Sequence, residues 1–474
     1  MKKQLLVMLV LAGCQSTKVS LQNEIQPPAQ FEQGGGGAAV DVRQWWQSWN
    51  DPVLNELMAK ALTGSFDVRV AESRWREAAA LAGLAAADRG PQLGASAKGS
   101  YSLAGKMDNP LPPAARQQLA NNPAAAALQA DKFDMTGSNV KLALSASWEP
   151  DFFGKKQSDA DAARFASQAA EAQLQGAKLL TTAAIADAYF QARAAEQQLA
   201  LNGEQAHTLA QLANYLDGRF RAGRVSAAEK DAVASKLKAL HSQRSTLQLD
   251  YDRQRRALAV LTGQPPQSFK LPAGRADLLQ RPPAPPAGQK PSDLLQRRPD
   301  LMAKAALVRV QAAQLASAKA DLLPRFTLDF SLPFFRISGD SQMQLWNAGL
   351  GANMTLPIFT NGRLQANINA ANAKLKTALL EYDQTLLQAL ADVDNGFQAV
   401  AALASQTDEL TEAVRLADTQ AGADEKLFKY GRKTLDAALQ TRLDSQALAV
   451  QRLRSQLGRA QALTALYKAL GGGW

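Results

Sequence analysis

The chain has 474 residues, enough for two or three ordinary domains of about 150 residues each. Apolar residues make up 46% of it and charged residues 20%, which excludes an intrinsically disordered chain. A single cysteine and two histidines exclude an intramolecular disulfide and a cysteine-rich zinc site. The 53 basic and 43 acidic residues give a net charge of +10, but the basic residues are dispersed, so the charge does not indicate a nucleic-acid surface.

The first residues have the features of a secretory leader. Lys2 and Lys3 precede an apolar run, and the leader ends Leu11-Ala12-Gly13-Cys14. This order is typical of a signal peptide, and its ending resembles the lipobox of bacterial lipoproteins, whose cysteine is lipidated and becomes the mature N-terminus. We therefore predict a lipoprotein signal peptide over 1–13 and lipidation, including palmitate, at Cys14. The alternative is a chance match of an apolar leader that ends in cysteine.

The segment after the leader is predicted to be a tether. Gln15 follows the cysteine, and among such lipoproteins this residue favours the outer membrane. A leader of 13 residues is shorter than the usual range of about 15–30, which is compatible with a natural start upstream of Met1. Glycines 34–37 give a flexible link, so 14–40 is expected to be a lipidated, flexible segment. Next, Trp45, Trp46 and Trp49 are expected to anchor a short helix by packing.

Prolines divide the remaining chain into helical and non-helical parts. None of the 21 prolines falls between Asp151 and Gln264 or between Ile358 and Trp474. Both windows are rich in residues with high helix propensity, and a glycine in a basic setting interrupts each of them, at Gly223 and Gly431. We predict two hairpins of long helices, over about 154–263 and about 362–470. A helix from 155 to 218 would be about 95 Å long, a length that suits a tube or a coiled coil.

The two helical windows are related by an internal duplication. Gly223 and Gly431 are 208 residues apart, and so are Phe220 and Phe428. We therefore predict a first structural repeat over 41–264 and a second over 300–474. A proline-rich connector over 265–299 is expected to be ordered but non-helical.

Four segments alternate between apolar and polar residues. They lie at about 92–103, 139–149, 325–335 and 345–357. Alternation over about ten residues is the pattern of a transmembrane β-strand with lipid on one side and water on the other. A half-buried strand in a soluble sandwich gives the same pattern, but the leader and the tube-length helices favour the membrane. The long stretch 105–137 is then expected to be an outward-facing loop.

Four strands cannot close a membrane barrel alone. An open edge in lipid leaves backbone groups unpaired, at several kcal/mol each, and single-chain barrels begin at about eight strands. Two or three copies of the chain are the smallest solutions, and three copies leave room for a channel. The residues by themselves therefore predict a mainly helical chain with a membrane β-barrel that two or three copies complete, and three copies of four strands would give 12 strands.

This arrangement resembles the TolC-type outer membrane factors, particularly the lipoprotein branch of OprM and NodT. The resemblance extends from about residue 41 to the end of the chain. It rests on the order of elements and on four segments: Gln44-Trp45-Trp46-Gln47-Ser48-Trp49-Asn50-Asp51-Pro52, Ser292-Asp293-Leu294-Leu295-Gln296-Arg297-Arg298-Pro299-Asp300, Leu356-Pro357-Ile358-Phe359 with Gly362-Arg363-Leu364, and Leu466-Tyr467-Lys468-Ala469-Leu470-Gly471-Gly472-Gly473-Trp474.

The resemblance implies a function and a set of partners. It implies a homotrimer in the outer membrane of a Gram-negative bacterium, lipid-anchored and extending into the periplasm. The fold class it implies is mainly helical with a membrane β-barrel: long α-helical hairpins form a periplasmic barrel, and four β-strands per protomer complete a trimeric outer membrane barrel of 12 strands. This channel would be the passive exit duct of a tripartite multidrug efflux system, conducting drugs and other small toxic compounds. Its partners would be a periplasmic adaptor, also called a membrane fusion protein, and an inner membrane pump of the resistance-nodulation-division (RND) or major facilitator type. No cofactor and no nucleic acid are implied.

The resemblance also implies where the gate and the docking tips lie. Alignment on the hairpin glycines places an acidic lock position at Glu229 and its basic partner at Lys433. The family's pore-narrowing aspartate position is occupied by Gln440, and Asp436 lies one turn earlier. The residues expected to meet the adaptor at the two tips are Arg221, Gly223, Arg224, Gly431 and Arg432.

Two other functions remain open from the sequence. The same fold could serve as a type I secretion duct for polypeptides, and a different class would be a periplasmic coiled-coil scaffold without a pore. An enzyme is not expected, because no set of nucleophile, base and metal ligands emerges. His207 and His241 each stand alone in a helical context and are expected to be surface or packing residues.

Overall fold

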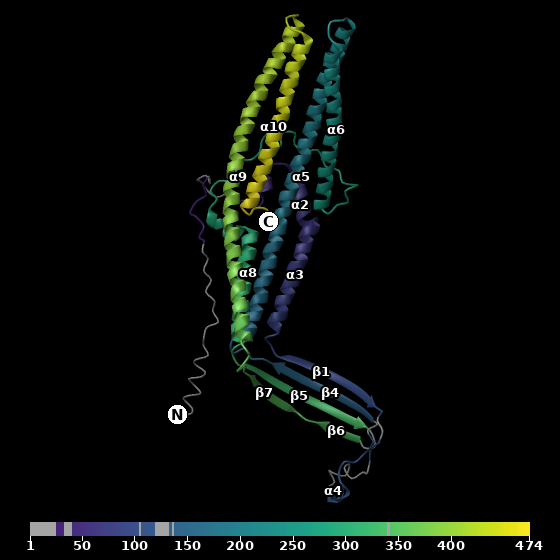
Figure 1. The fold of residues 1–474 in the computed structure, drawn as a ribbon, viewed down its shortest axis with the longest axis vertical. Helices are drawn as coiled ribbons and strands as arrows, with labels where there is room; N and C mark the ends of the chain where they lie inside the picture. Colours follow the sequence, from purple (N-terminus) through teal and green to yellow (C-terminus); the bar gives the residue numbers. More distant parts are fainter. Residues whose placement is uncertain (1–24, 33–39, 104–105, 119–131, 135–136, 339–341) are drawn as a thin grey trace. The chain divides into compact units, whose positions relative to one another are not determined.

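Figure 1 shows a computed structural model of the chain, which describes residues 25–32, 40–103, 106–118, 132–134, 137–338 and 342–474. Cys14, the rest of the predicted leader and glycines 34–37 lie outside these ranges, as does much of the predicted outward loop. The chain divides into two compact units, each treated by itself below. Among the described residues, one unit contains Ala79–Arg164 and Arg309–Lys376, and the other contains Leu21–Ala78, Phe165–Val308 and Thr377–Trp474.

Four long helices make the chain predominantly helical. The two longest have 67 residues each and their partners 35 each, so the longest are about 100 Å long at about 1.5 Å per residue. The second pair begins 208 residues after the first, since 363 − 155 and 435 − 227 give the same offset. The four are α5 (Lys155–Arg221), α6 (Ala227–Leu261), α9 (Arg363–Lys429) and α10 (Leu435–Ala469).

Shorter helices precede the strands, and two helical turns lie near the end of the connector. The helices α3 (Phe66–Ala87) and α8 (Pro299–Ala320) have 22 residues each. The connector, expected to be non-helical, carries two short helical turns near its end, the first begun by Pro291 at a helix-starting position. The remaining short helices are η1 (Trp45–Trp49), α2 (Pro52–Gly64), α4 (Pro113–Gln118), η3 (Pro291–Asp293) and α7 (Leu294–Arg297).

The strands form an open antiparallel sheet in the order β1-β4-β5, and both β6 and β7 pair with β5. The described sheet therefore has β1 at one edge and β6 and β7 at the other (Figure 1). A separate pair, β2 and β3, lies in the segment 105–137. The bounds are β1 (Gln92–Ser102), β2 (Lys106–Asp108), β3 (Lys132–Asp134), β4 (Gly137–Trp148), β5 (Arg325–Ser338), β6 (Gln342–Trp346) and β7 (Gly349–Thr355).

The fourth alternating segment, expected to be one strand, is divided into β6 and β7. Both keep a single register against β5, with Phe334 opposite Trp346 and Ser331 opposite Gly349. The interruption lies opposite Pro333, whose nitrogen has no hydrogen to donate to a neighbouring strand. The contact there is one hydrogen bond from the Asn347 N–H to the Pro333 carbonyl at 3.4 Å. A missing donor therefore breaks the strand without shifting its register.

Over β1, β4, β7 and the first part of β5, one face of the sheet is apolar and the other polar. Beyond Phe334 the pattern reverses, because Phe335 lies opposite Lys141 and Leu345, whereas Arg336 lies opposite Val140 and Gln344. Leu142 lies opposite Ala97 on one side and Phe334 on the other, whereas Ser147 lies opposite Asp329. Large apolar side chains on the first face are exposed in the single chain. Examples with their exposed fractions are Leu93 at 72%, Leu142 at 47% and Leu350 at 84%.

Within the other unit, the N-terminal tryptophans pack against the long helices. Trp45 stacks on Tyr467 of α10 with ring centroids 5.1 Å apart, and Trp49 contacts Phe190 of α5 at 4.3 Å. All three tryptophans of η1 are buried. None of the described helices combines the length and the hydropathy that a bilayer crossing requires.

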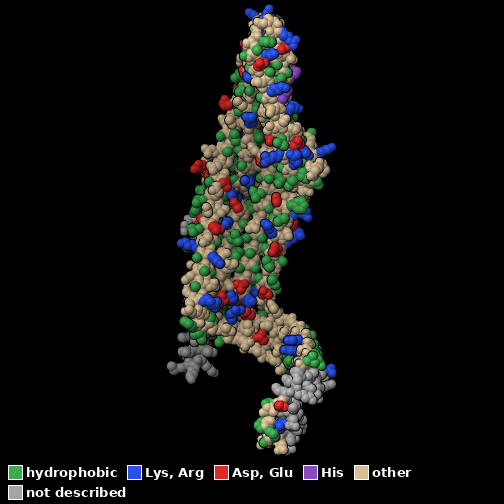
Figure 2. Space-filling model, turned by 45° about the vertical axis from the view of Figure 1, so that its right-hand side comes forward, with side chains coloured by type: hydrophobic (Ala, Val, Ile, Leu, Met, Phe, Trp, Pro, Cys, Tyr) green, Lys and Arg blue, Asp and Glu red, His purple; other side chains and the backbone are tan. Residues whose placement is uncertain are grey.

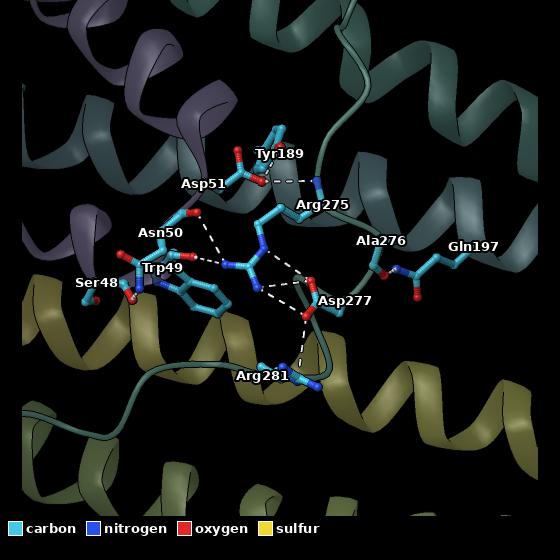
Figure 3. Close-up of polar contacts among 10 residues, drawn as sticks. All are labelled: Ser48, Trp49, Asn50, Asp51, Tyr189, Gln197, Arg275, Ala276, Asp277 and Arg281. Carbon is cyan, nitrogen blue, oxygen red and sulfur yellow. Dashed lines mark hydrogen bonds and ion pairs between the residues drawn. The ribbon is translucent and has the colours of Figure 1, made fainter.

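A buried polar cluster holds the connector against the start of α2 (Figure 3). Asp51 is fully buried and caps α2 by accepting from the Leu54 N–H at 2.9 Å. It also accepts from the Tyr189 hydroxyl at 3.0 Å, and the same burial raises the pKa of Tyr189 above its ordinary value. From the connector, Arg275 donates to the backbone oxygens of Trp49 and Asn50 at 3.4 and 3.3 Å. The Arg275 N–H also donates to Asp51 Oδ2 at 3.5 Å, so the Asp51 carboxylate contacts α2, α5 and the connector.

Candidate functional site at the hairpin tips

The two hairpin turns are built in the same way. At the first turn, Gly223 (φ 65°) donates to the Phe220 carbonyl and Arg224 donates to the Arg219 carbonyl, both at 2.9 Å. This double pattern is a Schellman motif, in which a left-handed residue ends the helix. The second turn repeats it around Gly431 (φ 69°). Both predicted glycines therefore have a structural role in reversing the chain, whatever they contact outside it.

The tips present basic and aromatic side chains to solvent. Arg221, Arg224 and Arg432 are exposed, and the Arg221 side chain, 80% exposed, pairs with Asp217 at 2.7 Å. Tyr430, beside the second glycine, is also 80% exposed. Figure 2 shows lysine and arginine side chains gathered at the hairpin end at the top of the view. The predicted docking residues thus belong to an accessible surface.

The two predicted lock residues each have a partner within their own hairpin. Glu229 and Ser226 form a capping box at the start of α6: the Glu229 N–H donates to Ser226 Oγ at 3.2 Å, and the Ser226 N–H donates to Glu229 Oε2 at 2.9 Å. Lys433 forms an ion pair with Asp424 of α9. Among the described residues of one chain, Glu229 and Lys433 are therefore not joined. A contact between them across neighbouring chains stays a prediction.

Asp424 of α9 accepts two side-chain contacts near the tip of the second hairpin. Its residue is 6% exposed, and it accepts from the Lys433 ammonium and from Thr441 Oγ1, the latter at 2.7 Å. These contacts, Lys433 first and Thr441 second, lower the pKa of Asp424 below its ordinary value. The carboxylate is therefore charged throughout the neutral range and fixes α10 to α9.

Asp436, one of the constriction candidates, instead links the two hairpins. Its Oδ1 lies 3.6 Å from Nη1 of Arg219 at the end of α5. The Arg219 guanidinium lies over the Tyr215 ring, 5.7 Å from its centroid. An apolar cluster beside this pair packs α10 against α5 and consists of Leu212, Leu216 and Leu439. The other candidate, Gln440, donates along its own helix to Asp444 at 2.9 Å.

A further row of polar contacts between α9 and α10 was not predicted from the sequence. Arg442 pairs with Glu425 at 2.8 Å and with Asp418 at 3.4 Å, and Ser445 also donates to Asp418. The spacing from the turn could have predicted these contacts, because residues about equally far before and after Gly431 lie opposite each other in the hairpin. Asp418 lies 13 residues before that glycine and Ser445 lies 14 after it.

Among the described residues, no group of three or more histidine, cysteine, aspartate and glutamate side chains is arranged to hold a metal ion. His207 contacts Gln211 one turn along α5 at 3.1 Å, and His241 is exposed on α6. The site consists of ion pairs and hydrogen bonds near two exposed hairpin tips. Such contacts can hold the ends of α5, α9 and α10 together or release them.

Comparisons with known proteins agree with this arrangement. The model of the family described as "Outer membrane efflux protein" matches residues 57–264 and 290–472. The pyoverdine export outer membrane protein OpmQ of Pseudomonas aeruginosa is 30% identical over 98% of this chain and 95% of its own length. The outer membrane protein OprJ of the same species is 26% identical over 99% of this chain and 95% of its own length.

A solved structure supports the fold. The open state of the Neisseria gonorrhoeae MtrE outer membrane channel superimposes with a TM-score of 0.79, at 24% identity, covering 96% of this chain and 98% of that one. These matches confirm the resemblance drawn from the sequence segments. The chain belongs to the outer membrane efflux protein family, the TolC- and OprM-type channels of Gram-negative bacteria that work with periplasmic adaptors and inner membrane pumps.

Proposed function

We propose that three copies of this chain form the exit duct of a tripartite efflux system, with a barrel of 12 strands in the outer membrane and a helical tunnel in the periplasm. The observation that carries this proposal is the open sheet. Its apolar face is exposed along its length in the single chain, and β1 and β6/β7 are edge strands among the described residues.

An open edge explains why copies must associate. In lipid, each unpaired backbone group costs several kcal/mol, so a spanning sheet must close. Four strand positions, β1, β4, β5 and β6 with β7, become 12 when three chains join edge to edge. Large barrels of this kind enclose a polar interior, and the polar face of this sheet would line it.

Conductance of the purified protein in planar lipid bilayers tests the proposal. We expect discrete channel events from a protein that migrates as a trimer. A trimer that never conducts, even with both Glu229→Ala and Lys433→Ala, would favour the non-conducting coiled-coil scaffold instead.

The lipid anchor is a separate part of the proposal. Cys14 would carry the acyl chains after removal of 1–13, and Gln15 would direct the mature protein to the outer membrane. Intact-mass measurement of the mature protein checks this directly. The expectation is a lipidated N-terminal cysteine that is lost in Cys14→Ser, and a Cys14→Ser protein with the same added mass would disprove it.

The hairpin tips would be the docking and gating end of the duct. The exposed basic residues Arg221, Arg224 and Arg432 would contact the adaptor. The ion pair between Arg219 and Asp436, rather than Asp436 alone as a pore-lining ring, would hold the two hairpins of one protomer together. Glu229 and Lys433 would meet between protomers.

The exported compounds would be drugs and other small toxic molecules, with energy supplied by an RND or major facilitator pump. A siderophore is a second candidate, because two Pseudomonas relatives, at 30% and 29% identity, are named for pyoverdine export. Expression in a host that lacks its own exit duct separates the two by drug susceptibility and by siderophore release. Secretion of a polypeptide without either effect would favour the type I secretion duct.

A further inference from the structure

Two lysines lie directly opposite each other in the sheet. Lys98 of β1 and Lys141 of β4 are register partners in the antiparallel pair. Both are exposed, and both belong to the polar face. Their chain neighbours Ala97 and Leu142 pair with each other and point to the apolar face. Side chains of directly opposed residues leave the sheet about 5 Å apart, and like charges placed so destabilise the pair.

Within the five-stranded sheet of the described residues, no acidic side chain is a register partner or close neighbour of these two lysines. The only acidic residue on β1, β4, β5, β6 and β7 is Asp329. It is paired with Ser147, six residues from Lys141 along β4, which is about 20 Å at about 3.3 Å per residue. Asp329 also accepts hydrogen bonds from Ser147 at 2.8 Å and from Asn353 at 2.9 Å. Asp329 therefore lies far from the two lysines along this face of the sheet.

The position of Lys141 is fixed by a contact with the third strand. Its ammonium lies over the ring of Phe335 at 5.1 Å from the centroid, and Phe335 is its register partner on β5. Cation–π contacts of this kind hold a lysine head group in place while leaving its charge intact. Lys98 and Lys141 therefore place two adjacent positive charges on β1 and β4, and the Phe335 ring on β5 contacts the second of them.

We propose that Lys98 and Lys141 form an anion-attracting ring in the outer part of the barrel, which favours the passage of anionic small molecules. The proposal rests on the proposed function: three protomers would bring six ammonium groups to one level of the lumen. Strand β1 begins five residues after α3 ends, so Gln92 lies at the helix-proximal end and Lys98 further outward. Rings of lysine or arginine are the usual basis of anion preference in water-filled pores.

The field of such a ring depends strongly on salt. The Debye length is about 30 Å at 0.01 M ionic strength and about 3 Å at 1 M. At low salt the ring would act across the whole lumen and concentrate anions there. At high salt it would be screened, so a true electrostatic effect must disappear as salt rises.

Reversal potentials in planar bilayers under a potassium chloride gradient test this inference on the purified trimer. The double variant Lys98→Gln with Lys141→Gln is expected to lower the chloride-to-potassium permeability ratio by about twofold or more at low salt, and by little at 1 M, where screening is nearly complete. The charge-preserving variant Lys98→Arg with Lys141→Arg should keep the wild-type ratio.

Arg336 provides the matched control. It follows Phe335 on β5 and pairs with Val140, so it lies on the apolar face at the same level of the sheet. Arg336→Gln removes the same charge but should leave the permeability ratio unchanged. If the trimer conducts and the double glutamine variant has the wild-type permeability ratio at low salt, the proposal of an anion-attracting ring is wrong and the proposed channel function is unaffected. If no form of the trimer conducts, the proposed function itself fails.

Discussion

Arg219 near the end of α5 and Asp436 in the first turn of α10 lie 3.6 Å apart, so one ion pair joins the tips of the two hairpins within a single protomer. Both side chains are partly exposed, and an exposed ion pair contributes about 0–1 kcal/mol. Such an ion pair is strong enough to favour the arrangement in which the two tips are joined, and weak enough for a docking partner to break.

Removing this tie should open the tips. We expect Arg219→Ala or Asp436→Asn to raise the fraction of time spent in the conducting state, by up to about fivefold for each protomer if the pair contributes about 1 kcal/mol. Single-channel recording measures this fraction. Arg221→Ala is the matched control, because Arg221 pairs with Asp217 on its own helix and should leave the open fraction unchanged. Equal effects of the two alanine variants would remove the special role of Arg219.

Glu229 has two separable roles, and a conservative substitution distinguishes them. Its side chain accepts from the Ser226 N–H in a capping box, which glutamine can also form. We expect Glu229→Ala to lower helix stability by about 1 kcal/mol, whereas Glu229→Gln keeps the cap. If Glu229 also meets Lys433 of a neighbouring protomer, both substitutions should raise conductance. Conductance that changes in Glu229→Ala alone would assign the residue to capping only.

The tie at Asp424 should be insensitive to pH across the physiological range. Lys433 and Thr441 lower the pKa of Asp424 below the ordinary value of 3.8. A lowered pKa means that the stabilising effect is fully present above that value and is lost only as the pH falls through the lower, folded-state value.

Hydrogen exchange in the α9–α10 tip measures this tie. We expect constant protection between pH 5 and 8, after correction for intrinsic exchange, and a uniform loss of protection in Asp424→Asn. Asp444→Asn is the control, because Asp444 is exposed and accepts from Gln440 on its own helix. A wild-type tip that loosens between pH 8 and 5 would contradict the assignment.

The buried carboxylate of Asp51 should be among the most sensitive positions in the chain. Asp51→Ala removes the cap of α2 and leaves the buried Tyr189 hydroxyl without its acceptor. We expect the free energy of unfolding to fall by about 2–4 kcal/mol, visible as a lower melting temperature. Asp51→Asn retains an oxygen acceptor for the cap and should cost less. Asp41→Ala, at an exposed pair with Arg43, should cost little, and an equal loss there would disprove the special role of Asp51.

The sequence by itself determined the features that depend on local chain chemistry. The absence of proline over 151–264 and 358–474 permits the long helices, and the glycines at 223 and 431 permit the left-handed turns that end them. Alternation around Leu142 and Phe330 identified the strands and their two faces, because successive side chains of a strand point to opposite sides. The family resemblance also rested on local segments.

Only the tertiary structure decided which distant residues share a partner. Within one chain, Lys433 pairs with Asp424 and Asp436 approaches Arg219, and no local pattern in the sequence indicated either pair. Pro333 interrupts the strand that pairs with it, which no feature of 345–357 reveals. Lys98 and Lys141 become opposite partners only through the register of β1 and β4. Propensity and periodicity act over a few neighbouring residues, whereas a side chain's partner depends on how helices and strands from remote parts of the chain pack.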